Sequence, residues 1–298
     1  MGALLALASA VFYGMADFAG GLLSRRAGFA LVALTGQAGG LVLALAAAPL
    51  YPAPSPAFPD LAWGALSGVG TGLGMIFLFR GMTRGAISVV VPVSAVGGLA
   101  LPVLAGVAVL GDRPSALSWL GILVAVPSLW LASRTAPALS TAPAASLDGL
   151  TAGAGIALQY AALAQAGQDS GIWPVTAGRL TALAVILPAA LPPLRAALTR
   201  QGAGPSGRTG RTGRAAWSVL PLRQAAGAAA TGAAATLALV FYLLATREQI
   251  VTVAVVLSSM YPAIPALLGL TVLRERPTRL QTAGLLGAAV ATGLLTAG

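Results

Sequence analysis

The chain contains no cysteine and no histidine. The absence of cysteine excludes disulfides and thiolate chemistry. The absence of histidine removes the commonest metal ligand and the usual general base. With only 7 acidic residues in 298, few groups remain from which a metalloenzyme or a hydrolase could build a site. We therefore expect no enzymatic activity, no bound metal and no cofactor.

Charged residues are also scarce. They make up 8% of the chain, against roughly 25% in a soluble domain. Hydrophobic residues make up 57%, and a soluble fold of this length cannot bury that much apolar surface. The bilayer must therefore surround most of the chain, and the 38 glycines suit helices that pack closely. The predicted fold class is an all-α integral membrane protein.

Lysine is absent too, so all 17 basic side chains are arginines, and with the 7 acidic residues they give a net charge of +10. In a soluble protein this charge would suggest a nucleic-acid partner. In a membrane protein, arginines beside the spans instead set the orientation through the positive-inside rule. We therefore expect membrane lipid and a small-molecule substrate as partners, and no nucleic acid. The first apolar run has no basic region before it, so we expect it to remain as a helix rather than to be cleaved as a signal peptide.

Ten segments are apolar over about 20 residues, which is the length that crosses a bilayer. Turn-forming or charged residues separate the segments. We predict ten transmembrane helices at residues 3–23, 29–49, 61–80, 86–110, 115–133, 148–167, 172–193, 224–246, 249–273 and 278–296.

One pattern of residues occurs twice, at a spacing of 163 positions. The first copy consists of Arg84, Ile87, Pro102, Gly106, Leu110, Arg113, Pro114 and Gly121. The second copy consists of Arg247, Ile250, Pro265, Gly269, Leu273, Arg276, Pro277 and Gly284. Duplicated membrane proteins are very often transporters, so the repeat points to transport as the function.

The repeat divides the chain into two units, residues 1–133 and 148–298, joined by a linker at 134–147 that is rich in Ala, Pro, Ser and Thr. The second unit contains a long basic segment, 195–222, which we predict to be a loop without regular structure. Each unit has five predicted helices. Because five is odd, two tandem units enter the membrane in opposite directions, which predicts an inverted repeat.

The arginines in the loops and at the ends of the predicted spans are unevenly distributed between the two sides of the membrane. Fourteen fall on one side, whereas only Arg113 and Arg247 fall on the other. The positive-inside rule then places both termini outside.

Each unit ends with a proline-containing helix, an acidic-Arg-Pro turn and a glycine-containing helix. These ends are Pro102…Gly111-Asp112-Arg113-Pro114…Gly121 and Pro265…Arg274-Glu275-Arg276-Pro277…Gly284. The first predicted helix also contains the aromatic-glycine sequence Phe12-Tyr13-Gly14. Over nearly its whole length the chain resembles two EamA repeats of the drug/metabolite transporter superfamily. Asp112 and Arg274 depart from the Gly-Glu turn of that family.

The resemblance implies a ten-helix basket with a central cavity between the halves, located in the inner or plasma membrane. It implies transport of small organic solutes such as amino acids, drugs or metabolites, and it places both termini in the cytoplasm, against the arginine count. No nucleotide-binding motif is present, so an ion or solute gradient must supply the energy.

We therefore expect a secondary active transporter working by alternating access, with export favoured over uptake. The alternatives are a non-transporting membrane scaffold or regulator and, less favoured, a membrane enzyme. Gly64, Gly68 and Gly72 form overlapping G-x-x-x-G steps that serve packing within the chain or a dimer face, so both a monomer and a homodimer stay open.

Charged groups inside a membrane are costly and are candidates for function. Asp17 is the only acid well inside a predicted span, and it could bind a proton or a cationic substrate, act as a structural partner of an arginine, or lie close to the interface. Arg179 is the only arginine well inside a predicted span, and it could bind an anionic group, pair with Asp17 or extend to the interface.

Uncharged polar side chains within the spans are further candidates for binding substrate or proton. They are Tyr13, Gln37, Ser94, Gln159, Tyr160, Gln165, Tyr242, Ser258, Ser259 and Tyr261. A shift of 147 positions relates Gln159 and Tyr160 to Phe12 and Tyr13, so both halves offer an aromatic at a similar depth. Proline removes helical hydrogen bonds and favours kinks, so we predict hinges at Pro92, Pro102, Pro262 and Pro265.

Overall fold

The structure is a computed structural model in which all regular elements of the described residues are helices. It describes residues 1–24, 26–51, 53, 56–83, 94, 98, 101, 103, 106–108, 111–132, 143–202, 220–261, 263–264, 267–268 and 278–297. The α-helices are α1 (Gly2–Ser24), α2 (Phe29–Ala47), α3 (Phe58–Thr83), α5 (Ala116–Ala132), α6 (Pro143–Leu163), α7 (Trp173–Gly202), α8 (Leu222–Glu248), α9 (Val251–Ser258) and α11 (Arg279–Ala297). Short 3₁₀ helices lie at Ala48–Leu50 (η1) and Gln168–Ser170 (η2).

Five of the described helices contain a stretch long and apolar enough to cross a membrane: α1, α2 continued through η1, α3, α7 and α8. Shorter apolar stretches lie in α5 and α11. The all-α prediction is confirmed for the described residues, and several long apolar helices indicate an integral membrane protein. Most of the predicted span 86–110 lies outside the described residues, and so does the last part of 249–273, from residue 269 onward.

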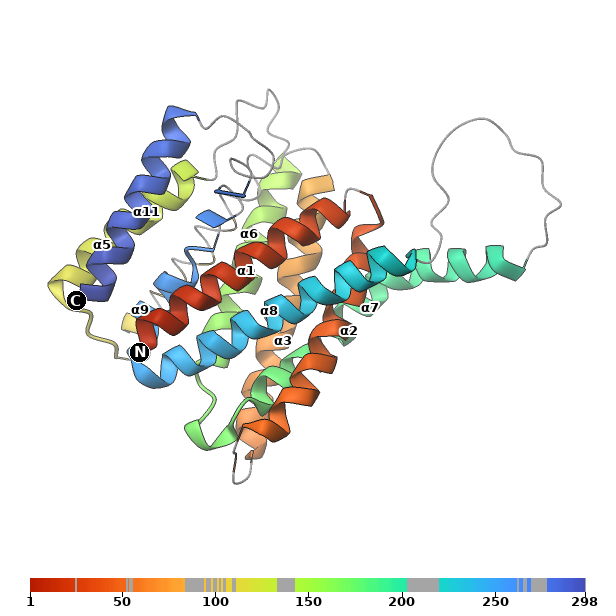
Figure 1. The fold of residues 1–298 in the computed structure, drawn as a ribbon, viewed down its shortest axis with the longest axis horizontal. Helices are drawn as coiled ribbons and strands as arrows, with labels where there is room; N and C mark the ends of the chain where they lie inside the picture. The colour runs from red at the N-terminus through yellow and green to blue at the C-terminus, as the bar shows by residue number, and fades with distance from the viewer. Residues whose placement is uncertain are drawn as a thin grey trace.

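Two helices, α6 and α7, run well beyond the predicted boundaries. Helix α7 continues to Gly202, so the first residues of the segment 195–222 are helical, as suits their Ala, Leu and Arg content. This distal part extends away from the other helices (Figure 1). Helix α6 begins at Pro143, inside the predicted linker, where proline is well tolerated in a first turn.

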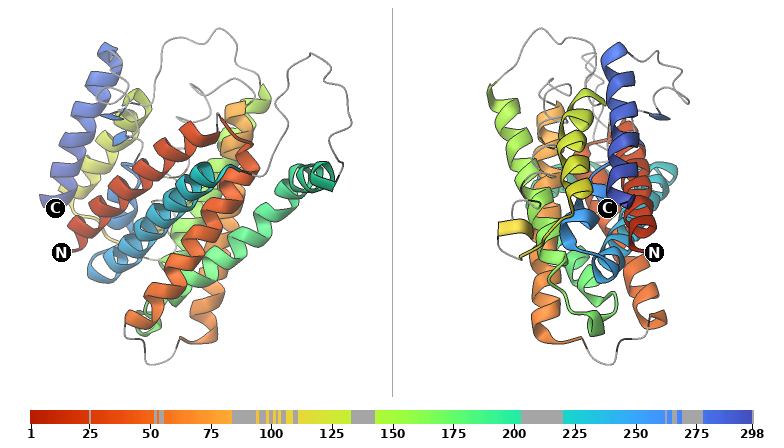
Figure 2. Two further views of the ribbon diagram at one scale, coloured as in Figure 1. Left: turned by 45° about the vertical axis from the view of Figure 1, so that its right-hand side comes forward. Right: turned by 90° about the vertical axis from the view of Figure 1, so that its left-hand side faces the viewer.

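The described helices pack mainly against partners from the other predicted unit. Helix α1 packs along α8, and α3 packs along α6. Helix α2 also packs on α8, and α7 on α3. Six helices thus form two groups, which we call the α1–α2–α8 group and the α3–α6–α7 group. Helices α2 and α7 join the groups, and α5 and α11 form a separate pair (Figure 2).

Glycines bring the backbones into contact within each group. A side chain at Gly68 would overlap the backbone of Gly178, so α3 and α7 touch directly. Gly64 and Gly72 also face α7, which confirms packing within the chain as a use of these glycines. In the other group, Gly232 of α8 lies against the backbone of Gly36 of α2. Such close approach is how membrane helices gain van der Waals contact.

The end of the bundle that holds the chain's first residues is tied by several contacts, and we call it the amino-terminal end. There Gly2 faces Glu248, and the Gly167 amide donates to Asp60 Oδ1 at 2.8 Å. Arg247 Nη2 donates to the carbonyls of Gly171 at 2.7 Å and Gly167 at 3.0 Å. Helix α11 also ends close to the start of α1 (Figures 1 and 2).

The acidic residue of the first repeated turn also acts at the amino-terminal end. Asp112 Oδ2 accepts hydrogen bonds from the Thr252 amide at 2.7 Å and from Thr252 Oγ1 at 2.6 Å. A carboxylate here satisfies a free N–H group in the first turn of α9 and complements the helix dipole. Gly111, just before it, has φ of 75°, a conformation that favours glycine. The turn is therefore part of the scaffold.

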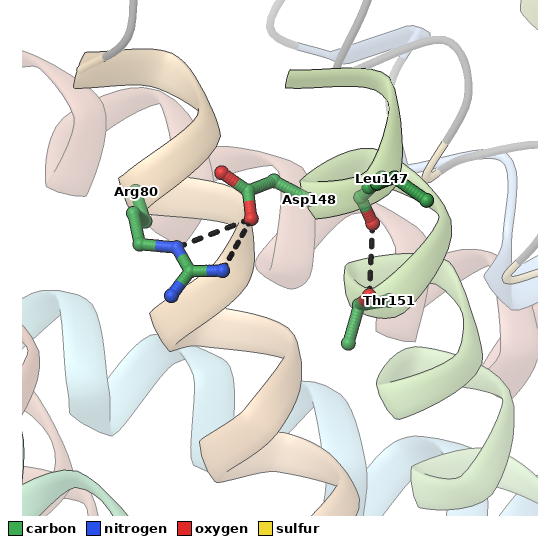
Figure 3. Close-up of polar contacts among 4 residues, drawn as sticks. All are labelled: Arg80, Leu147, Asp148 and Thr151. Atoms are coloured by element: carbon green, nitrogen blue, oxygen red, sulfur yellow. Dashed lines mark hydrogen bonds and ion pairs between the residues drawn. The ribbon is translucent and has the colours of Figure 1, made fainter. Parts of the chain in front are cut away.

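The opposite end of the bundle is joined by an ion pair between the end of α3 and the beginning of α6 (Figure 3). Arg80 donates to Asp148 Oδ1 from Nη2 at 2.6 Å and from Nε at 3.1 Å. The Arg80 guanidinium also lies 4.4 Å from the centre of the Phe77 ring. The Asp148 side chain is buried, whereas that of Arg80 is 40% exposed.

Candidate ligand-binding cavity

A cavity lies between the two three-helix groups. Its interior volume is about 40 Å³, inside an envelope of about 490 Å³ that includes space open to the surroundings. The walls combine two charged groups with polar and small apolar side chains from α1, α2, α3, α7 and α8. The lining residues are Tyr13, Ala16, Asp17, Gly20, Val32, Gly36, Gln37, Thr71, Met75, Arg179, Thr231, Gly232 and Ala235.

The cavity is situated at half the length of the helices. Gln37, Thr71 and Ala235 each lie near the middle of α2, α3 and α8 respectively. From there the lining continues toward the opposite end, as far as Gly20 near the end of α1 and Thr231 in the first half of α8. Access from that end is therefore the shorter route.

Arg179 is held inside the cavity wall and is only 2% exposed. Its Nη1 donates to Gln37 Oε1 at 2.8 Å, and its Nη2 donates to the carbonyl of Ala235 at 2.9 Å. Gln37 in turn donates from Nε2 to Met75 Sδ at 3.0 Å, which orients its carbonyl toward the guanidinium. The Arg179 Nε is buried and has no hydrogen-bond partner among the described residues.

Asp17 lies in the same cavity, but it does not pair with Arg179. Across the described residues, the ion pair found is Arg80–Asp148, and no hydrogen bond is found for the Asp17 carboxylate. Two opposite charges thus line one cavity without contacting each other. The hypothesis of direct Asp17–Arg179 pairing does not describe this conformation, and Arg179 does not extend to the interface.

A hydrogen-bond network forms the wall around Tyr13. Thr71 Oγ1 donates to Gln159 Oε1 at 2.6 Å, and Gln159 Nε2 donates to the Tyr13 hydroxyl at 3.3 Å. Ser67 Oγ donates to the Gln159 carbonyl at 2.8 Å. Gln159 is fully buried and does not line the cavity, so it positions Tyr13 and Thr71 from behind.

Four of the five tyrosines form one cluster next to the cavity. Tyr13 lies 5.0 Å from Tyr261 and 6.4 Å from Tyr160, between ring centres. Tyr160 lies 4.6 Å from Tyr242, whose hydroxyl donates to the Tyr160 carbonyl at 2.8 Å. Tyr160 and Tyr242 are in the parts of α6 and α8 that lead to the amino-terminal end. The cluster therefore closes the cavity on that side.

The remaining predicted residues do not line the cavity. Ser258 Oγ donates to the Ala6 carbonyl at 3.3 Å, and Gln165 donates to the carbonyl of Ala161 on its own helix at 3.4 Å. Ser94 and Ser259 are buried elsewhere. The predicted hinge residues Pro92, Pro102, Pro262 and Pro265 lie outside the described residues.

Several lining residues were not predicted. Thr71 and Thr231 resemble the many threonines whose hydroxyl lies against a preceding carbonyl of their own helix. Thr231 donates to the Ala228 carbonyl, whereas Thr71 shares its one proton between Gln159 and the more distant Ser67 carbonyl. Met75 and the small lining residues carry no chemical signal in an apolar sequence. Among the described residues no group of three His, Cys, Asp or Glu side chains could hold a metal ion.

A solved structure described as "Crystal structure of protein" is similar to this chain, with a TM-score of 0.68. The match covers 99% of this chain and 96% of the other, at 16% sequence identity. At that identity the likeness shows a shared overall fold. No protein-family model and no curated protein sequence matches the chain.

Proposed function

We propose that the chain is a secondary active transporter that exports small organic solutes across the cell membrane by alternating access. The observation that carries this proposal is the cavity at half the length of the helices, where Asp17 and the buried Arg179 face one space. Ionisable groups at such a depth are costly in a membrane and mark substrate or ion pathways. Transporters typically bind their substrates near the bilayer midplane between repeats.

The proposal includes ten spans arranged as an inverted repeat of the EamA type. In such a repeat α1 corresponds to α6, α2 to α7 and α3 to α8. The α1–α8 contact then corresponds to α6–α3, and α2–α8 to α7–α3. The glycine contact Gly36–Gly232 corresponds in the same way to Gly178–Gly68. These matched contacts support a two-fold relation between the units.

The alternating movement takes place between the two three-helix groups rather than between the two halves of the sequence. Each group is joined internally by glycine contacts. Between the helices of different groups, the polar contacts are those of Arg179 with Gln37 and Ala235, Gln37 with Met75, Gln159 with Tyr13, and Tyr242 with Tyr160. Exchanging a few such contacts would open the other side of the cavity.

The arginine distribution gives the direction. Arg26, Arg80 and Arg223 lie near helix ends at the opposite end of the bundle, which the positive-inside rule assigns to the cytoplasm. The cavity continues toward that end and is closed by tyrosines at the other. A solute would therefore enter from the cytoplasm, which supports export.

Transport in reconstituted liposomes tests the proposal. Liposomes loaded with a mixture of amino acids, amines and carboxylates should release specific solutes when they contain the protein. Asp17→Asn and Arg179→Gln should reduce release by about tenfold or more, because each removes a charged contact inside the cavity. Gln165→Leu is the matched control, since Gln165 lies outside the cavity. If correctly folded protein moves none of the solutes under an imposed gradient, a scaffold or regulatory role replaces transport.

A further inference from the structure

We propose that Asp17 and Arg179 bind the two ends of one zwitterionic ligand, a small molecule with an ammonium group and a carboxylate. This assignment rests on the proposed function in that it uses the same cavity, and it specifies the substrate class. It starts from the finding that the two charges line one cavity without forming an ion pair.

The Arg179 end of the cavity is prepared for a carboxylate. A guanidinium carries five N–H donors in a fixed plane, and two contacts, to Gln37 and Ala235, hold this one in place. Its Nε has no partner, although the residue is only 2% exposed. A buried donor without an acceptor is costly. A carboxylate that reaches this edge would satisfy the free donor with a charge-assisted hydrogen bond.

The Asp17 end is prepared for a cation. An ionised carboxylate only accepts hydrogen bonds, and within the described residues nothing donates to Asp17. An ammonium group would supply several donors together with the opposite charge. Gly20 and Ala16, beside Asp17, have the small side chains that leave room for such a group.

A ligand with both charges satisfies the cavity better than a ligand with one. A lone cation leaves Arg179 with its free donor, and a lone anion leaves Asp17 without a partner. A zwitterion satisfies both and adds no net charge to a low-dielectric site. Val32 and Met75 provide an apolar surface for the rest of the molecule.

The position of the two residues links binding to movement. Asp17 belongs to the α1–α2–α8 group and Arg179 to the α3–α6–α7 group. A ligand held by both residues joins the groups and therefore favours the conformation in which they are closest. A ligand with one charge contacts only one of the two groups. It would therefore shift the equilibrium between open and closed arrangements of the groups less.

Binding of matched ligand triplets to the purified full-length protein tests the assignment. The triplets are L-alanine, L-valine and L-leucine, each with its amide, which lacks the carboxylate, and its deamino acid, which lacks the ammonium. Affinity is measured by calorimetry. For at least one triplet the zwitterion should bind about tenfold or more tightly than both analogues.

Two variants should each remove a different part of this preference. Asp17→Asn should remove the advantage of the amino acid over its deamino analogue, while the deamino acid binds as before. Arg179→Lys should remove most of the advantage over the amide. If both variants weaken all three ligands equally, or the wild-type protein binds the analogues as well as the zwitterion, the assignment is overturned.

The same ligands in liposomes separate this inference from the proposed function. Transport of a lone, membrane-impermeant cation such as tetraethylammonium, without preferential zwitterion binding, contradicts the inference and leaves the transporter in place. Selective zwitterion binding without movement across the bilayer supports the inference and contradicts transport.

Discussion

The cavity and the tyrosine cluster lie next to each other along the interior of the same bundle, but they are built in contrasting ways. The cavity has small side chains and two separate charges, and it leaves space unfilled. The tyrosine cluster fills its space with aromatic rings whose centres are 4.6 to 6.4 Å apart. Under the proposed transport function, filling one side while leaving the other hollow would give access to the cavity from one side only, as alternating access requires.

Removal of an aromatic ring from the filled side should have the largest effect. In Tyr242→Ala the ring that packs on Tyr160 is lost along with the hydrogen bond to its carbonyl. We expect a loss of about 3–5 kcal/mol in the free energy of unfolding, because a large buried ring leaves a cavity. Thermal unfolding in detergent measures it.

Tyr242→Phe is the matched control for that experiment. It keeps the ring and removes only the hydroxyl, so the expected loss is about 1 kcal/mol. Equal losses in the free energy of unfolding for the two variants would mean that packing of the Tyr242 ring contributes nothing to stability.

A side chain added to the wall of the hollow side should have the next largest effect. In Gly232→Val the new side chain would overlap the backbone of α2 at Gly36. Separation of α2 and α8 should cost about 3 kcal/mol or more. Gly21→Ala is the control, since no atom lies within 4 Å of the added methyl. It should stabilise α1 by up to about 1 kcal/mol. If the Gly232→Val protein is as stable as the wild type and keeps its cavity, α2 and α8 are not in close backbone contact at Gly36 and Gly232.

The Arg80–Asp148 ion pair, at the end of the bundle opposite the amino-terminal end, should respond differently to loss of each partner. Arg80→Gln removes the guanidinium that pairs with the buried Asp148 carboxylate, and we expect a cost of about 2 kcal/mol. Asp148→Asn leaves Arg80, which is 40% exposed, free to be hydrated, so about 1 kcal/mol or less is expected. Chemical unfolding of both variants measures the order, and the reverse order would argue against burial of Asp148.

Labelling with introduced cysteines should leave stability almost unchanged while comparing the two sides directly. The chain has no cysteine, so each new thiol is unique. Gly20→Cys lies in the cavity lining, whereas Ser9→Cys lies at a fully buried position on the tyrosine side. A membrane-impermeant maleimide should modify the first about tenfold or more faster than the second, because the second requires local opening. Equal rates would remove the contrast between the sides.

The sequence predicted the helices and the charged part of the cavity for physical reasons. Apolar segments of spanning length are a strong signal. Asp17 and Arg179 were identifiable because charges are rare and costly in hydrocarbon. Tyr13 and Gln37, predicted as polar candidates, also line the cavity.

Other features depend on packing and had no signal in the sequence. Ser258 and Gln165 satisfy backbone carbonyls instead of facing the cavity, a choice that polar side chains in helices often make. The pairing of α1 with α8 and of α3 with α6 joins segments far apart in the chain. Local periodicity identifies a helix, but it does not identify the helix against which it packs.

The exchanged pairing of helices has a consequence for how the protein is made. During synthesis α1 and α2 enter the membrane long before α8, and α3 enters before α6 and α7. The first unit must therefore wait in the bilayer with its glycine-lined faces unpaired and with Asp112 lacking its partner Thr252. Neither unit completes its packing until the last helices arrive, so assembly is a late event that involves the whole chain.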